Sequence, residues 1–160
     1  MICNVLVILW IVLIIVLVVL LFKYAYNKPS AIYLFQNDNK TDIKYISLDV
    51  QGRLLNMLVD TGCGISIIRS DVVDVLEHNK SPRKISLQAL TPDSLASNVV
   101  SIPITIGNKK IIEDFALYRE SDIANFEALY GITLHGILGA EFFEKTNCKI
   151  DYKKHCLIIP

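Results

Sequence analysis

The chain has 160 residues, of which 16 are basic and 16 are acidic, so its formal net charge is zero. This length predicts one domain with an appendage. Because no basic stripe is visible, the sequence gives no indication of nucleic-acid binding. The four cysteines lack the C-x-x-C spacing of common zinc sites, so we expect no metal centre.

Residues 1–22 are dominated by an unbroken apolar run from Val5 to Phe22. A helix needs about 20 apolar residues, with some tolerance below, to cross a bilayer. A cleaved signal peptide is disfavoured, because no Lys or Arg precedes the run and Lys23-Tyr24-Ala25-Tyr26 is a poor cleavage site. A helix that is apolar on every face is also not expected in the core of so small a protein. We therefore expect a single-pass transmembrane anchor.

Residues 23–40 are expected to form a polar linker, with a short apolar island at 31–35. Four lysines follow the predicted span, whereas only the α-amino group precedes it. The positive-inside bias then places the rest of the chain in the cytoplasm. The lysines are Lys23, Lys28, Lys40 and Lys44.

The first half of the remaining chain predicts strands joined by short turns. Strands are expected over 43–50 and 53–59, with Gln51-Gly52 as the turn between them. A short helix is expected from Ser70 to Glu77. Two further strands, 84–90 and 99–106, flank the polar turn at 91–94.

The second half continues this pattern. Gly107-Asn108 is a hairpin signal leading into a strand over 109–117. A helix is expected over 121–130, where Gly131 suits the position after its last turn. A strand over 132–138, a helical turn over 140–145 and a final hairpin (149–152 and 155–159) complete the chain. In that hairpin residue 151 faces 156, so Cys148 and Cys156 lie on opposite faces and are not expected to form a disulfide.

The stretch Leu58 to Ser66 places one carboxylate, Asp60, between two apolar runs. An Asp-Thr-Gly sequence is an ordinary turn former, and three residues alone would favour that simpler interpretation. The flanks argue against it, because turns between strands are usually bordered by polar positions. A carboxylate in apolar surroundings is costly unless it is hydrogen-bonded or shares a proton.

This stretch resembles the catalytic loop of retropepsin-like aspartic peptidases, in which two apolar residues precede Asp-Thr/Ser-Gly. Gly136 to Phe143 is similar to the hydrophobic-hydrophobic-Gly element and short helix of that family, and Cys148 to Tyr152 is similar to the strand that follows. Three matches in the right order are more specific than any single one. The resemblance covers residues 41–160. It implies an all-β, retropepsin-like half-barrel with two or three short helices, here preceded by the transmembrane helix, and it places the substrate-covering flap at 84–106.

Peptide hydrolysis by carboxylates needs two of them, one ionised and one protonated, which share a single proton. The sequence contains only one Asp-Thr/Ser-Gly. The resemblance therefore implies a homodimer in which Asp60 of each copy forms the catalytic pair across a two-fold axis. The expected activity is that of an aspartic endopeptidase, a hydrolase acting on protein or peptide substrates without any cofactor.

Six neighbours of Asp60 are expected to support the site. Thr61 would hydrogen-bond across the two-fold axis, and the Gly62 N–H would reach Asp60. Leu138 would shield the carboxylate from below, and Gly139 would allow a close approach to the loop. Ser66 would tie the loop to nearby backbone, and Cys63 would occupy the position that is usually Ala or Ser.

Departures from the family pattern are Cys63 and Glu141, the latter standing where Asp or Asn is commoner. A third is the polar entry to the final strand, at Lys145, Asn147 and Cys148. Cys63 acting as a nucleophile with His135 as base is a weaker alternative to the aspartate pair. His78 and His155 suggest no site. A different class of function is a catalytically silent, membrane-tethered dimer that binds an extended peptide in the same fold.

Overall fold

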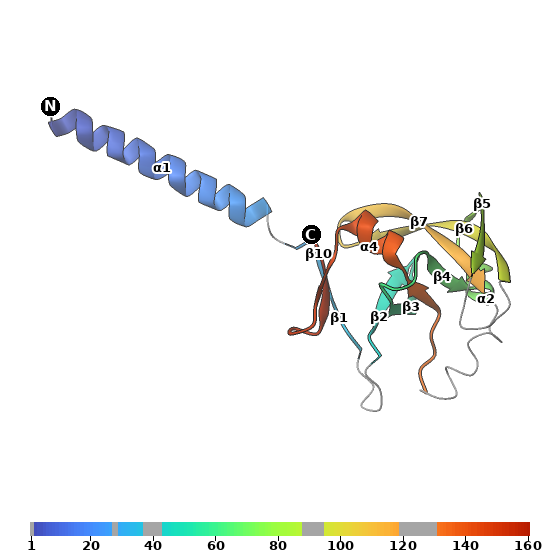
Figure 1. Ribbon diagram of the computed structural model, residues 1–160. Helices are drawn as coiled ribbons and strands as arrows, with labels where there is room; N and C mark the ends of the chain where they lie inside the picture. The colour runs from blue at the N-terminus through green and yellow to red at the C-terminus, as the bar shows by residue number, and fades with distance from the viewer. Residues whose placement is uncertain (1, 27–28, 37–42, 88–94, 119–130) are drawn as a thin grey trace.

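The computed structural model describes the chain except for residues 1, 27–28, 37–42, 88–94 and 119–130. A long N-terminal helix precedes a domain built mostly from strands (Figure 1). The mostly-β class with short helices is therefore confirmed for the domain. The helix predicted over 121–130 and the turn predicted over 91–94 lie outside the described residues.

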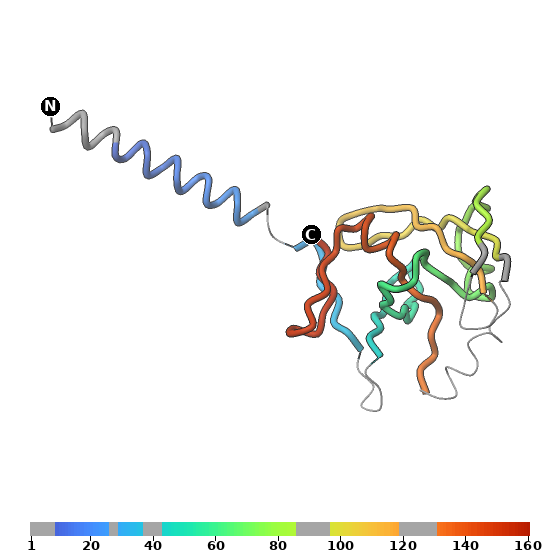
Figure 2. The backbone as a smooth tube through the Cα atoms, in the orientation of Figure 1, coloured from blue at the N-terminus to red at the C-terminus, as the bar shows by residue number. Residues whose placement is uncertain are grey.

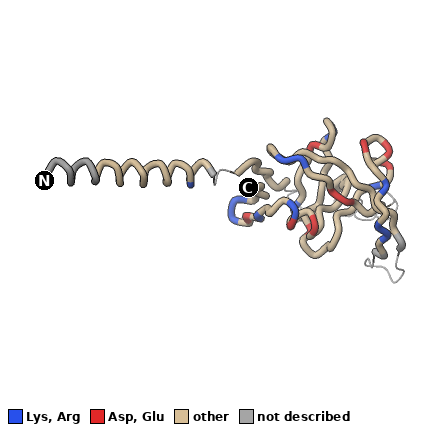
Figure 3. The backbone as a smooth tube through the Cα atoms, turned by 90° about the horizontal axis from the view of Figure 1, so that it is seen from above, with Lys and Arg blue, Asp and Glu red and all other residues tan. Residues whose placement is uncertain are grey.

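Helix α1 (Ile2–Tyr26) extends away from the domain (Figure 2). Its side chains are described from residue 9 to residue 25, and all of these are exposed. Charged residues of both signs are interspersed over the domain, whereas the described part of α1 carries only Lys23 near its end (Figure 3). Within the described residues no helix is both long and apolar enough to cross a membrane, so the structure does not support the predicted transmembrane span.

A three-stranded sheet contains the two ends of the domain, in the order β1-β10-β9. Its strands are β1 (Ala31–Leu34), β9 (Lys149–Asp151) and β10 (Cys156–Ile159). Asp151 faces Cys156, as the sequence predicts for the final hairpin. Strand β1 falls inside the stretch predicted to be a linker. Its apolar residues pair antiparallel with β10, from Ala31 opposite Ile159 to Leu34 opposite Cys156, and this pairing satisfies the backbone of both segments.

A seven-stranded sheet forms the body of the domain, in the order β2-β3-β8-β4-β7-β6-β5. Strand β8 lies between β3 and β4, parallel to β3 and antiparallel to β4. The strands are β2 (Tyr45–Val50), β3 (Arg53–Val59), β4 (Ser66–Arg69), β5 (Asn79–Leu87), β6 (Leu95–Ile106), β7 (Lys109–Tyr118) and β8 (Gly136–Leu138).

Both predicted tight hairpins are present. Gln51 and Gly52 have φ values of 55° and 81°, so the turn between β2 and β3 needs left-handed backbone at both positions. Gly107, with φ of 58°, begins the turn between β6 and β7. A Cβ there would also lie 2.8 Å from the Ser30 carbonyl oxygen, so this turn packs against the residue preceding β1.

Several predicted elements differ in length. Strand β6 begins at Leu95 rather than at 99. Helix α2 (Ser70–Val73) is one short turn rather than a helix to Glu77, because the chain soon joins the sheet as β5. Strand β5 begins at 79 rather than 84, pairing with β6 across an irregularity between Lys80 and Lys84. Strand β8 starts only at Gly136. The segment before it is held instead by contacts such as the bond from the Asn56 side-chain amide to the Thr133 carbonyl (3.1 Å).

The main core lies between the two sheets and helix α4 (Ala140–Thr146). Its largest fully buried side chains come from both sheets and from α4, so the terminal sheet and the main sheet share one apolar interior. They are Phe115, Phe142, Ile46, Leu48, Met57, Ile68, Ile102, Ile106, Leu138, Leu157 and Ile159.

Candidate active site

The stretch around Asp60 forms the loop between β3 and β4. Asp60 directly follows β3, and β4 begins six residues later at Ser66. Because β8 is inserted between these two strands, the loop passes over its end (Figure 1). The Asp60 N–H donates to the Leu138 carbonyl at 3.2 Å, which fixes the base of the loop to the last residue of β8.

The tip of the loop folds back on the Asp60 carboxylate. The Gly62 N–H donates to Asp60 Oδ1 at 2.9 Å, as the sequence led us to expect. A Cβ at Gly62 would lie 3.2 Å from that same oxygen, so a side chain there would crowd the hydrogen bond. Thr61 and Gly62 are exposed and Asp60 is partly exposed, which leaves this end of the loop open to a ligand or a second chain.

Gly139 lies directly beneath the loop. A Cβ at this position would be 2.5 Å from both the carbonyl carbon and the oxygen of Ile65, and 2.8 Å from the Cys63 oxygen. These atoms belong to the backbone, so no side-chain rotation could relieve the clash. The next two residues add to the contact, since the Ala140 N–H donates to the Cys63 carbonyl (2.7 Å) and the Glu141 N–H to that of Gly64 (3.2 Å).

Leu138 is fully buried, and its carbonyl accepts the Asp60 N–H at the base of the loop. Ser66 is also fully buried, and its hydroxyl accepts a hydrogen bond from the Gly139 N–H at 3.1 Å. The expected tie between Ser66 and nearby backbone is therefore present. Gly139 therefore connects Ser66 to the backbone of the Asp60 loop. The hydrogen bond expected of Thr61 across a two-fold axis stays a prediction.

Sequence reasoning missed a second partner of Ser66. Its hydroxyl donates to Glu113 Oε1 at 2.7 Å, and Lys145 Nζ donates to Glu113 Oε2 at 3.0 Å. Glu113 is fully buried. Burial raises the pKa of its carboxyl, and the bonds from Ser66 and Lys145 only partly oppose this shift. The available signal was an acidic residue at an inward-facing position of the strand over 109–117.

Cys63 is partly buried, and its thiol lies 3.0 Å from the Ile65 carbonyl oxygen, to which it donates. Burial and the nearby charge of Asp60 raise the pKa of this thiol. A raised pKa disfavours the thiolate that a nucleophile requires. His135 Nδ1 meanwhile accepts the Asn56 N–H at 2.9 Å. Both observations weigh against the alternative pairing of Cys63 with His135.

A small apolar cluster follows the loop. It contains the buried residues Ile65, Val99 and Ala116, with the partly buried Ile67 and Ile85 packed against them. Ile65 is the last residue of the loop, and the other four come from strands β4, β5, β6 and β7. The cluster therefore joins the exit of the Asp60 loop to the β5–β6 pair.

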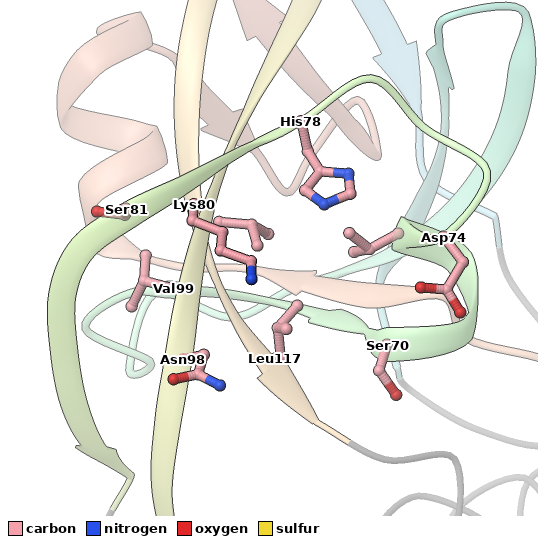
Figure 4. A pocket seen from close by; sticks show the side chains of 10 residues that line it. Ser70, Asp74, His78, Lys80, Ser81, Asn98, Val99 and Leu117 are labelled. Atoms are coloured by element: carbon pink, nitrogen blue, oxygen red, sulfur yellow. The ribbon is translucent and has the colours of Figure 1, made fainter.

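A cavity of about 260 Å³ lies between α2 and the β5–β6 pair (Figure 4). Lys80 and His78 extend into it, and Val99 and Leu117 contribute to its apolar lining. No residue of the 58–66 loop lines it, so this cavity is separate from the candidate active site. Among the described residues, no group of three His, Cys, Asp or Glu side chains is arranged to hold a metal ion.

Neither a family model nor a curated protein matches the chain. Solved structures similar to it include the retroviral protease-like domain of Ddi1 from Leishmania major (15% identity, TM-score 0.47, covering 74% of this chain and 87% of that one). A retropepsin-like aspartic protease from Rickettsia conorii has 18% identity and a TM-score of 0.49, covering 81% and 87%. EIAV protease complexed with the inhibitor HBY-793 has 15% identity and a TM-score of 0.46, covering 72% and 99%.

The chain is thus similar to retropepsin-like aspartic proteases in solved structures as well as in its sequence motifs.

Proposed function

We propose that the chain is an aspartic endopeptidase that hydrolyses peptide bonds with water activated by two Asp60 carboxylates, one from each copy of a homodimer. The observation that carries this proposal is the geometry of the Asp60 loop. Its carboxylate accepts the Gly62 N–H, and the loop rests on Gly139 with no space for a side chain between them. A partly exposed carboxylate that is held by a backbone hydrogen bond suits a group that must act in a fixed position.

The proposed reaction divides its work between two carboxylates. The ionised one takes a proton from water, and the protonated one donates a hydrogen bond to the carbonyl of the scissile peptide. Two neighbouring carboxylates reach this state because both cannot be charged together. Since the sequence offers one Asp-Thr-Gly, the second carboxylate must come from a second copy. The exposed Thr61 and Gly62 support this, because they leave the loop open to such a partner.

We also propose, from the sequence, that the N-terminal run over Val5–Phe22 tethers the protein to a membrane with the domain in the cytoplasm. Its support is the length of the run and the lysines that follow it. The test is alkaline extraction of membranes from cells that express the full chain, followed by protease treatment of sealed vesicles. Release into the supernatant would refute the tether, and protection of the domain inside right-side-out vesicles would agree with the orientation.

The test of the peptidase is cleavage of a diverse peptide mixture by the full chain in detergent micelles, over a range of pH and protein concentration. Asp60→Asn removes the proposed proton acceptor. Asp71→Asn is a matched control, because Asp71 is an exposed carboxylate on α2. We expect cleavage that rises faster than linearly with protein concentration, disappears in Asp60→Asn and persists in Asp71→Asn.

Absence of cleavage by a folded, dimeric protein would refute the peptidase. Binding of an extended peptide under the same conditions would then identify the catalytically silent peptide-binding module as the function.

A further inference from the structure

Arg83 connects strand β5 to two other elements of the domain. Its Nη2 donates to Glu141 Oε1 at 2.8 Å and its Nη1 to Glu141 Oε2 at 3.0 Å, so the guanidinium holds the α4 carboxylate through both oxygens. Nη1 also lies 3.2 Å from Asp114 Oδ2 on β7. The other Asp114 oxygen accepts the Ser101 hydroxyl at 2.6 Å. A two-pronged contact of this kind fixes orientation as well as distance.

Glu141 links this contact to the Asp60 loop. While its side chain binds Arg83, its backbone N–H donates to the Gly64 carbonyl at 3.2 Å. Glu141 is also only two residues beyond Gly139, which packs against the loop backbone. Glu141 therefore connects β5 to the loop directly, because it binds Arg83 with its side chain and Gly64 with its backbone N–H.

The other side of the connection is Ile85, two residues after Arg83 on β5. Residues separated by two lie on the same face of a strand. Ile85 packs against the cluster of Ile65, Val99 and Ala116, in which Ile65 is the last residue of the Asp60 loop. Arg83 thus stands where it can set the position of an apolar side chain beside the loop.

The exposure of Arg83 and its partners favours a positioning role over a role in general stability. Its side chain is 44% exposed, and those of Glu141 and Asp114 are 31% and 20% exposed. Exposed ion pairs contribute little to the free energy of unfolding. A bidentate contact between three separate elements is better suited to positioning than to general stability. The contact also explains the departure at Glu141, since its longer side chain has a specific partner here.

We propose that Arg83, acting through Glu141, is a positioning residue that holds the β5 wall and Ile85 in register with the Asp60 loop. The proposal rests on the proposed peptidase function for its kinetic consequence. Its structural consequence, coupling of β5 to the loop, does not depend on that function. The two consequences are therefore measured separately.

The kinetic experiment uses the full chain and compares Arg83→Gln, Arg83→Lys, Glu141→Gln and the double variant Arg83→Gln/Glu141→Gln. Asp71→Asn is the matched control, because it breaks an arginine–carboxylate pair with Arg69 that lies outside the Asp60 loop. Small misplacements of a reacting group reduce rates by up to about 100-fold. We expect kcat/KM to fall about 10- to 100-fold in Arg83→Gln and Glu141→Gln, and less in Arg83→Lys. The double variant should be no worse than either single variant, as in a coupled pair.

The structural experiment is amide hydrogen exchange on the same variants. We expect faster exchange at residues 63–66 and around Ile85 in Arg83→Gln, and no such change in Asp71→Asn. Unchanged exchange at these residues, or losses in kcat/KM that multiply in the double variant, would overturn the proposal. If the unmodified chain cleaves nothing, the peptidase function fails, and hydrogen exchange still decides whether Arg83 positions the loop.

Discussion

Two charged networks support the Asp60 loop, and they differ chiefly in burial. In the first, Lys145 of α4 binds the fully buried Glu113, which also accepts the Ser66 hydroxyl. In the second, Glu141 of α4 binds the exposed Arg83. Glu141 and Lys145 are four residues apart and thus lie on one face of the helix. One short helix therefore serves both networks.

The same residue type behaves in opposite ways in the two networks. Burial raises the pKa of the Glu113 carboxyl, because its charged form is removed from water. The pKa of the Glu141 carboxyl is lowered by its hydrogen bonds to Arg83. The buried network should therefore affect stability strongly, and the exposed network should affect geometry more than stability.

The largest effect should come from the backbone contact on which both networks depend. Gly139→Ala forces a Cβ to within 2.5 Å of the Ile65 backbone, so we expect a loss of about 3 kcal/mol in the free energy of unfolding. Urea denaturation measures it. Gly64→Ala is the control, because a Cβ at Gly64 meets nothing within 4 Å. Equal stability of the two variants would contradict the packing described here.

Removing the Ser66 hydroxyl tests the buried network. Ser66→Ala leaves the Gly139 N–H without this acceptor and removes one hydrogen bond to Glu113. A buried polar group that loses its partner costs about 1–3 kcal/mol, and denaturant unfolding should show a loss of this size. Ser47→Ala removes a partly buried hydroxyl bonded to Asn56 (3.0 Å) and serves for comparison. A larger loss in Ser47→Ala would show that the Ser66 network is not the stronger one.

The two carboxylates should give opposite dependence of stability on pH. Because the folded-state pKa of Glu113 is raised, its contribution is most favourable below the ordinary glutamate pKa. That contribution declines as pH rises toward the folded-state value. Glu113→Gln should remove this decline from a series of unfolding free energies measured at successive pH values. An unchanged slope would indicate that Glu113 does not titrate in this way.

The smallest effect on stability is expected in the exposed network. Because the pKa of Glu141 is lowered, its contribution is present above the ordinary glutamate pKa and is lost as pH falls through the lower folded-state value. Arg83→Gln should cost roughly 0.2–1 kcal/mol at neutral pH, and less in acid. A loss as large as that of Ser66→Ala would mean that Arg83 stabilises the fold generally.

The local features of the candidate site were predictable from the sequence. The β2–β3 hairpin is encoded by Gln51-Gly52, and it delivers Asp60 at the end of β3. The bond from the Gly62 N–H to Asp60 spans two residues, so it follows from the turn itself. The close approach at Gly139 joins distant segments, and it was expected only because residues 136–143 resemble a family motif in which a residue without a side chain fits under a backbone.

Features that depend on distant pairing were mispredicted. Residues 31–34 were predicted to be part of a linker, because a short isolated strand has no partner for its backbone. In the folded domain they pair with β10. Helix α2 is short and β5 is long for a similar reason. Ladder pairing with β6 from residue 79 onward outweighs the weak helical preference of the preceding segment.

The sequence by itself determined the hairpin that leads into Asp60 and the turn at Gly62, because each depends on neighbouring residues and short-range geometry. The close packing of Gly139 under the loop was expected only from the resemblance to a family motif, since Ser66 and Gly139 are 73 residues apart. Only the tertiary structure decided which charged residues support that loop. Ser66 and Glu113 are 47 residues apart, and Arg83 and Glu141 are 58 apart. No local sequence pattern identifies such pairs. A charged residue on a strand could equally face solvent, and only the folded structure shows which residue lies opposite it.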